Sequence, residues 1–145
     1  MSTTTLRESY AGQLRALLEA EPALQALGVQ FSRSVFEALD MRAIRYALVL
    51  HHGADAPGHE TTGAVDRHSE LLLTLMVRDT DPEPLAEAVL AIVHPLVMGF
   101  TAEQLIDVSE LATDAPAYDH TGGMRLARTV HYDLFYRTQR SSLSA

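Results

Sequence analysis

The sequence predicts a single α+β domain, in which a mainly antiparallel sheet of about four to five strands carries amphipathic helices on one face. Three observations support this prediction. The length of 145 residues suits one domain. Several segments alternate apolar and polar residues, as strands with one buried face do, and two others repeat apolar residues at helical spacing. We expect the domain to span residues 1–138, with residues 139–145 as a disordered C-terminal tail.

The N-terminal segment predicts two helical stretches and a short strand. A capping box begins at Thr5, and an apolar stripe follows it. Pro22 disfavours helical geometry in the residue before it, so the first helix should end near Ala20. One further helical turn should end at Gly28, and Val29–Ser34 is predicted to be a strand.

Two longer strands are predicted next, over Arg42–His51 and Arg67–Arg78, because every second residue in each is apolar and these residues share one face. They are Ile44, Tyr46, Leu48 and Leu50 in the first strand and Leu71, Leu73, Leu75 and Val77 in the second. Residues 53–66 lie between them and contain Gly53, Pro57, Gly58 and Gly63 without any periodicity. This stretch is long for a loop in a compact domain, and such loops are usually functional or disordered. We therefore expect a flexible loop over residues 53–66 that becomes ordered on binding a partner.

The second half of the chain predicts one long helix and two strands. Asp81 is expected to be the N-cap of the helix, and Pro95 is expected to kink or end its last turn. A second capping box at Thr101–Gln104 should open one helical turn. Strands are predicted over Leu105–Leu111 and Met124–Thr138, and the second has the most regular alternation in the chain.

The composition excludes several classes of function. The chain has no Cys, so it cannot hold a disulfide, a thiolate nucleophile or a Cys-based zinc site. Its net charge is −8, which disfavours generic binding to a nucleic-acid backbone. The N-terminus lacks the apolar segment of a secretory signal, and the apolar run Leu85–Phe100 is too short to span a bilayer. We therefore expect a cytosolic protein without a membrane partner.

Candidate catalytic groups have simpler structural explanations. A zinc site could draw on the histidines around residues 53–66, but adjacent histidines on a strand point to opposite faces. These histidines are His51, His52, His59 and His68. Acidic residues at positions 79–83 suit the start of a helix, where negative charge is favourable. The Gly-x-Ser-x-Gly and Walker motifs are absent. We therefore expect no catalytic, cofactor or metal site and no enzymatic activity.

Several stretches carry a resemblance to a known family. Three are sequence stretches: Glu-Pro-Ala-Leu-Gln-Ala-Leu-Gly at Glu21–Gly28, Arg-His-Ser-Glu-Leu-Leu-Leu-Thr-Leu-Met-Val at Arg67–Val77, and Val-His-Tyr-Asp-Leu-Phe-Tyr-Arg-Thr at Val130–Thr138. The other two are a predicted strand at Ala43–Leu50 and a predicted helix with a proline near its end at Leu85–Val97. In these features most of the chain resembles the tail terminator proteins of long-tailed bacteriophages, the minor tail protein U family.

The resemblance implies a hexameric ring that caps the tail tube, stops its growth and offers a surface to the head–tail connector. It implies a protein of the virion tail, assembled in the host cytoplasm, with no cofactor. DNA would pass through the ring without specific binding, past acidic residues. By position, the loop that contacts the next subunit would include Asp55, His59, Glu60, Asp66 and Arg67.

Two other functions are left open by the sequence. The chain could be a small bacterial module that binds a ligand or a protein partner. It could also be a metalloenzyme that uses some of His51, His52, His59 and His68.

Overall fold

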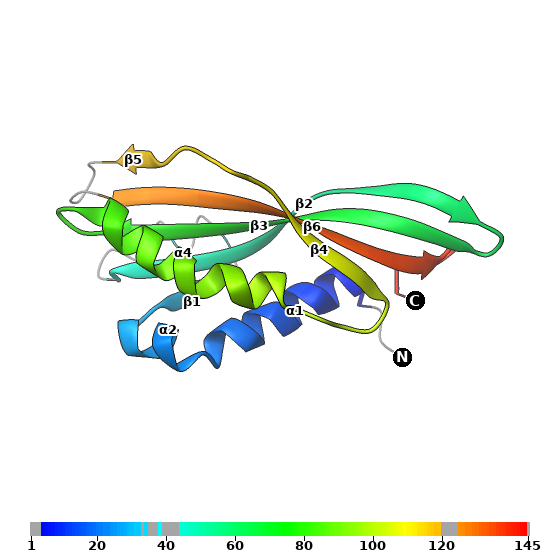
Figure 1. Cartoon of the computed structure of the whole chain (residues 1–145), viewed down its shortest axis with the longest axis horizontal. Helices are drawn as coiled ribbons and strands as arrows, with labels where there is room; N and C mark the ends of the chain where they lie inside the picture. The colour runs from blue at the N-terminus through cyan, green and yellow to red at the C-terminus, as the bar shows by residue number, and fades with distance from the viewer. Residues whose placement is uncertain (1–3, 33, 35–37, 39–43, 120–124, 145) are drawn as a thin grey trace.

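The computed structural model describes residues 4–32, 34, 38, 44–119 and 125–144. Its helices and strands are α1 (Leu6–Glu19), α2 (Pro22–Leu27), β1 (Gln30–Ser32), β2 (Tyr46–Thr61), β3 (Ala64–Arg78), α4 (Pro82–Met98), β4 (Leu105–Thr113), β5 (Ala117–Asp119) and β6 (Arg125–Gln139) (Figure 1). The strands form one six-stranded sheet in the order β1-β2-β3-β6-β4, and β5 also pairs with β6. Among the strands that the structure describes, β1 and β2 pair in parallel and the other pairs are antiparallel. The predicted α+β class with a mainly antiparallel sheet is confirmed.

The N-terminal helices begin and end where local signals place them. The Thr5 hydroxyl accepts a hydrogen bond from the Glu8 N–H at 3.3 Å, which caps the first turn of α1. Helix α1 ends at Glu19, and α2 starts at Pro22, where the missing N–H costs nothing. Gly28 ends α2 with a φ of 72°, a left-handed conformation that glycine adopts without strain.

Helices α1, α2 and α4 pack on one face of the sheet and enclose the main core. The alternating residues Leu71, Leu73, Leu75 and Val77 of β3 are fully buried, as the sequence pattern predicts. Tyr10 of α1 packs edge-on against Tyr136 of β6, with 5.5 Å between ring centroids. Burial of this continuous apolar surface supplies most of the free energy that favours folding.

The opposite face of the sheet carries a smaller apolar cluster. It comprises the buried residues Ala38, Ala47, Val49 and Met76, with Ala127 packed against them. Part of the segment between β1 and β2 lies outside the described residues, as do residues 42 and 43 of the predicted strand Arg42–His51 and Met124 of the last predicted strand.

The predicted loop over residues 53–66 is wrong. Strands β2 and β3 continue through it and meet in a tight turn at Gly63, whose φ is 82°. Pro57 fits in a strand here because β2 uses only one edge for pairing at this level, so a missing N–H is tolerated. A Cβ on Gly53 would lie 2.6 Å from the Leu72 side chain, so this glycine allows a close approach of the two strands. The register shifts after His52 and after Pro57, and these bulges hide the strand periodicity.

The structure also differs from the sequence predictions on both sides of the connection between α4 and β4. The predicted helical turn at Thr101–Gln104 is absent, because the chain turns sharply at Gln104, with a φ of 65°, and enters β4. Helix α4 continues past Pro95 to Met98, so the proline lies in the last turn and does not end the helix. Asp81 is the N-cap residue as predicted, but its side chain makes no capping hydrogen bond.

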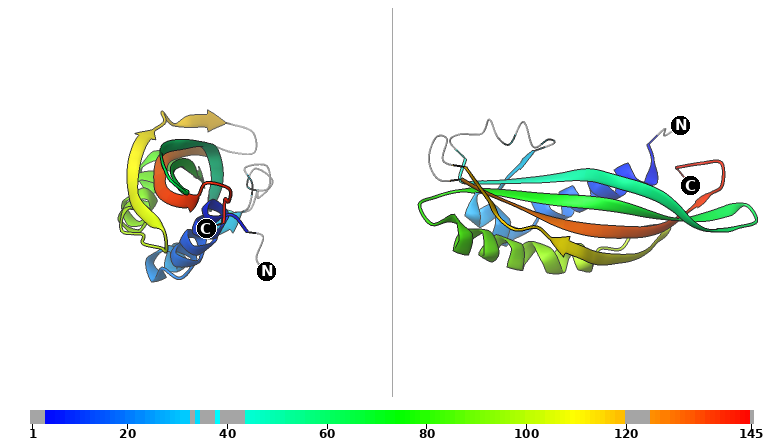
Figure 2. Two further views of the ribbon diagram at one scale, coloured as in Figure 1. Left: turned by 90° about the vertical axis from the view of Figure 1, so that its right-hand side faces the viewer. Right: turned by 90° about the horizontal axis from the view of Figure 1, so that it is seen from above.

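The molecule is elongated because the hairpin extends past the helices. Figure 1 shows the β2–β3 turn and the end of β6 projecting beyond the helical layer, and Figure 2 shows the strong curvature of the sheet from its end. We refer to residues 53–70 as the distal hairpin. Near it, the backbone N–H of Leu6 donates to the carbonyl of Leu143 at 2.9 Å. The division into a domain of residues 1–138 and a disordered tail of residues 139–145 stays a prediction.

Candidate assembly surfaces

The five residues singled out from the sequence all lie on the distal hairpin, but they do not form one site. Asp55 and Arg67 lie on the face of the sheet that the helices cover, and their nearest charged atoms are 3.5 Å apart. Asp66, one residue from Arg67 on β3, therefore points to the opposite face. His59 and Glu60 are exposed near the tip. The strand geometry thus divides the predicted interface between two faces.

Asp55 is the centre of a buried polar cluster that joins the hairpin to α1. One carboxylate oxygen accepts a hydrogen bond from the Tyr136 hydroxyl at 2.5 Å and lies 2.9 Å from the Arg7 guanidinium. Arg67 pairs with the other oxygen and donates to the Thr138 hydroxyl at 3.1 Å. The Asp55 side chain is only 8% exposed, so this cluster is an internal clamp on the hairpin.

Electrostatics support the clamp. Burial raises the pKa of Asp55, but hydrogen bonds from Tyr136 and Arg7 outweigh it and hold the pKa below its ordinary value. Burial and the bond to Asp55 together raise the pKa of Tyr136. Asp55 is therefore ionised at neutral pH, and Tyr136 is a neutral donor to it.

Asp66 and Glu60 pair with arginines at and just after the C-terminal end of β6. Arg137 donates to Asp66 at 2.6 Å, and this bond lowers the pKa of Asp66. Glu60 pairs with Arg140 at 2.8 Å, and both side chains are at least half exposed. Because Asp55 and Asp66 are both buried and paired with arginine, neither presents free negative charge on a surface that DNA could pass.

The histidines considered for a metal site lie apart. His51 hydrogen-bonds Thr74 at 3.1 Å, whereas His52 turns to α1 and lies 2.7 Å from Glu8. His68 bonds Asp133 at 2.7 Å and stacks on Phe135. Among the described residues, no group of three or more His, Cys, Asp or Glu side chains is arranged to hold a metal ion. In the same part of the chain, no helix has the length and apolar character needed to cross a membrane.

One polar cluster was not anticipated from the sequence. His131 of β6 lies between two carboxylates, 2.5 Å from Glu70 of β3 and 3.0 Å from Asp114 at the end of β4. Hydrogen bonds to Asp114 and Glu70 raise the pKa of His131. These three residues are far apart in sequence, so only the strand pairing could bring them together.

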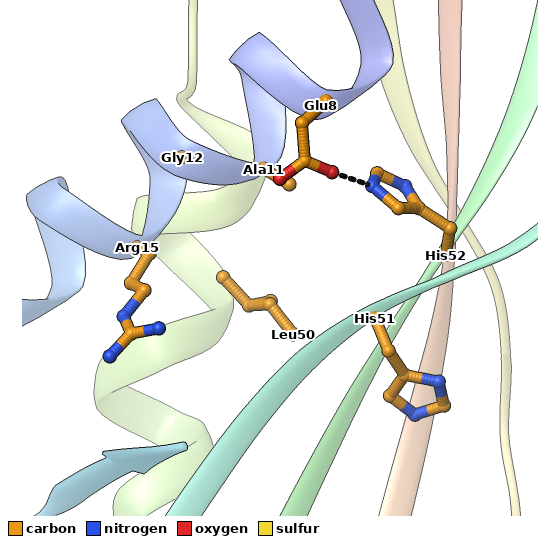
Figure 3. Close-up of a pocket in the computed structure, with 7 residues that line it drawn as sticks. All are labelled: Glu8, Ala11, Gly12, Arg15, Leu50, His51 and His52. Atoms are coloured by element: carbon orange, nitrogen blue, oxygen red, sulfur yellow. Dashed lines mark hydrogen bonds and ion pairs between the residues drawn. The ribbon is translucent and has the colours of Figure 1, made fainter. Parts of the chain in front are cut away.

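A groove runs between α1 and β2, immediately beyond the point where β1 stops pairing. Its volume is about 380 Å³, and its walls include Ala11, Gly12 and Arg15 of α1 and Leu50 and His52 of β2. Figure 3 shows Leu50 between the two elements, His52 turned toward Glu8 and His51 turned away. A Cβ on Gly12 would meet nothing within 4 Å, so the groove is open above this residue.

The opposite edge of the sheet is formed by β4, which pairs only with β6 in the part of the chain that the structure describes. Two register shifts each insert one extra residue, and the extra residues are Ile106 and Leu111. Bulges of this kind re-aim side chains. Here they leave Ile106 51% exposed and Leu111 57% exposed. Large apolar side chains on an edge strand are typical of a surface that contacts another protein.

Comparisons with known proteins identify the fold. Neither a protein-family model nor a curated protein matches the sequence. Among solved structures, the chain is similar to a chain in the virion of a native gene transfer agent particle, with a TM-score of 0.65 and 15% identity. The similarity covers 91% of this chain and 95% of that chain. Most of the fold is therefore similar to that of a chain in that particle.

Proposed function

We propose that this chain is a structural protein of a phage-like virion, and specifically the terminator of its tail. In this role it forms a hexameric ring on the end of the tail tube, stops tube growth and offers the surface that meets the head–tail connector. The chain performs no catalysis and needs no cofactor. It acts in the virion tail after assembly in the host cytoplasm.

The observation that carries this proposal is the nearly complete overlap in fold with a chain of a gene transfer agent virion. A domain added to an unrelated enzyme would leave part of one chain unmatched, whereas here more than nine-tenths of both chains superpose. The resemblance of the sequence to tail terminators supports the same role.

The surface of the molecule supports assembly of several copies. A ring with one kind of subunit needs two different patches that fit each other on each copy. The molecule has two such regions on opposite edges of its sheet, the α1–β2 groove and the bulged strand β4. A net charge of −8 also suits a ring through which DNA passes without adhering.

Sedimentation of the purified chain over a wide concentration range tests the proposal. We expect a species of six times the 15.9 kDa chain mass that grows with concentration and appears as rings by electron microscopy. The second measurement is the length of tail tubes polymerised with and without the protein, and we expect it to stop their growth. A discrete dimer at every concentration, with tube length unchanged, would contradict the proposal and favour a partner-binding module.

A further inference from the structure

We propose that β4 of one copy packs against the β2 edge of the next copy, with Leu111 entering the α1–β2 groove and Ile106 packing on Ala56 and Pro57. This inference rests on the proposed function, because it names the contact through which identical copies would close a ring. The occupant of the groove is thus a second copy of this chain.

The direction of the strands permits this contact. Strands β2, β3, β6 and β4 are successively antiparallel, so β4 runs opposite to β2. We take the copies to be related by rotation about an axis parallel to the strands. Such a rotation leaves the direction of every strand unchanged. Strand β4 of one copy then lies antiparallel to β2 of the next.

A closed ring relates its copies by rotation without translation, so the two contacting patches must lie at the same level along the ring axis. Leu111 and the groove lie at the same level. It lies between Glu110 and Ala112, and backbone pairing across the sheet connects these two residues to His52 and His51 of β2. The two rows of partners are His52–Leu71–Tyr132–Glu110 and His51–Leu72–His131–Ala112.

Ile106 meets the same condition at a second point. It lies between Leu105 and Asp107, and the rows of partners connect these residues to Pro57 and Ala56 on the outer edge of the distal hairpin. These rows are Leu105–Tyr136–Arg67–Pro57 and Asp107–Phe135–His68–Ala56. Ala56 and Pro57 are both exposed. Each bulged apolar residue therefore has an apolar acceptor at its own level on the opposite edge.

Apolar contacts carry the attraction between the two edges. The exposed charges of β4 are the acidic Asp107 and Glu110. Arg15 and His52 at the groove already pair with Glu19 and Glu8, so charge contributes little to this contact. Burial of a leucine-sized side chain supplies the attraction itself.

The contact is made by side chains and does not require a continuous ladder of backbone hydrogen bonds. Two bulges interrupt β4, and Pro57 has no N–H to donate on the β2 edge. Bulges usually discourage edge-to-edge pairing, but here they turn two large apolar side chains of β4, Ile106 and Leu111, outward. Among the described residues, no strand pairs with β2 on this side beyond Val49, and the groove there, open above Gly12, can receive one of them.

Cysteine cross-linking tests this register directly, because the natural chain has no Cys. Four single variants are made: Gly12→Cys, Ala56→Cys, Ile106→Cys and Leu111→Cys. They are mixed in pairs under mild oxidation, with one member of each pair enlarged by a tag so that mixed dimers separate on a gel. A disulfide requires Cα atoms within about 7 Å.

The matched pairs are Leu111→Cys with Gly12→Cys and Ile106→Cys with Ala56→Cys. We expect each to form mixed dimers at least tenfold faster than the mismatched pairs, in which the partners are displaced by roughly 16 Å along the strands. Sedimentation of the Ile106→Asp, Leu111→Asp double variant should show loss of the large species. Leu27→Asp on α2, where Leu27 is 39% exposed, is the matched control and should assemble normally.

The outcomes separate this inference from the proposed function. Suppose that the wild-type chain forms rings. Equal cross-linking of matched and mismatched pairs, or normal assembly of the double variant, would then overturn the proposed interface. The proposed ring itself would stand. A wild-type chain that neither self-associates nor limits tube length would overturn the proposed function and this contact with it.

Discussion

The two halves of the β2–β3 hairpin use the same two strands but are stabilised by different interactions. Near the helices, Leu48, Leu73 and Leu75 are buried in the apolar core. In the distal hairpin the buried side chains include Asp55, Ser69 and Asp66, and arginines pair with the two carboxylates. Apolar burial is not directional, whereas a buried carboxylate needs partners at defined positions. The distal half therefore depends on a few specific contacts.

The largest expected effect lies in the apolar half. Leu73 is completely buried in the core, so Leu73→Ala should lower the free energy of unfolding by about 3 kcal/mol through lost burial and a cavity. Urea unfolding measures this change. Leu27→Ala, at a residue 39% exposed and outside the proposed subunit contact, is the control and should change stability by less than about 0.5 kcal/mol. Equal losses in the two variants would mean that β3 does not form the core described here.

A smaller effect is expected in the polar half. Asp55→Ala removes the acceptor of Tyr136 and the partner of Arg7 and Arg67, and should cost about 1–3 kcal/mol because buried donors lose their bonds. Urea unfolding again measures it, and Glu103→Ala, at an exposed carboxylate outside the proposed subunit contact, is the control. A neutral result for Asp55→Ala would show that the cluster does not clamp the hairpin.

The cost of this change should depend on pH. The pKa of Asp55 in the folded chain lies below its ordinary value of 3.8, so its stabilising contribution is present above that value and is lost as the pH falls through the folded pKa. The difference in stability between wild type and Asp55→Ala should therefore shrink in acid below about pH 4. A difference that stays constant down to pH 2 would indicate a packing effect without a charge contribution.

The smallest effect is expected at the tip of the distal hairpin. Glu60 and Arg140 form an ion pair with both side chains at least half exposed, and such pairs contribute little. Glu60→Gln should change the free energy of unfolding by less than about 1 kcal/mol. Thermal unfolding at low and high salt measures this difference, and a loss above that range would place Glu60 with Asp55 in the polar clamp.

The same contrast explains which predictions from the sequence succeeded. Every second residue from Leu71 to Val77 is apolar and buried against the helices, so the sequence predicts this part of β3 as a strand. Residues 53–61 of β2 are almost all exposed and contain Gly53, Pro57 and Gly58, so they carry no alternation and were assigned to a loop. Their strand conformation depends on pairing with β3, which a local pattern does not record.

Interaction sites were harder to predict from the sequence than helices and strands. The five residues chosen for an interface do lie on one hairpin, but Asp55 and Arg67 are internal contacts. Ile106 and Leu111 belonged to a segment predicted only as a strand, and their exposure follows from bulges against β6. A regular period of two would have placed their side chains on opposite faces. Only the observed register shows that both are the extra residues.

The sequence alone determined the α+β class, the ends of α1 and α2, and the buried faces of β3 and β6. These features depend on neighbouring residues, through capping, the restriction before proline and the alternation of side chains. The tertiary structure alone decided the length of the hairpin, the Asp55 clamp and the alignment of Leu111 with the groove. Each of these requires residues distant in sequence to meet, and the register that brings them together is set by pairing across the whole sheet.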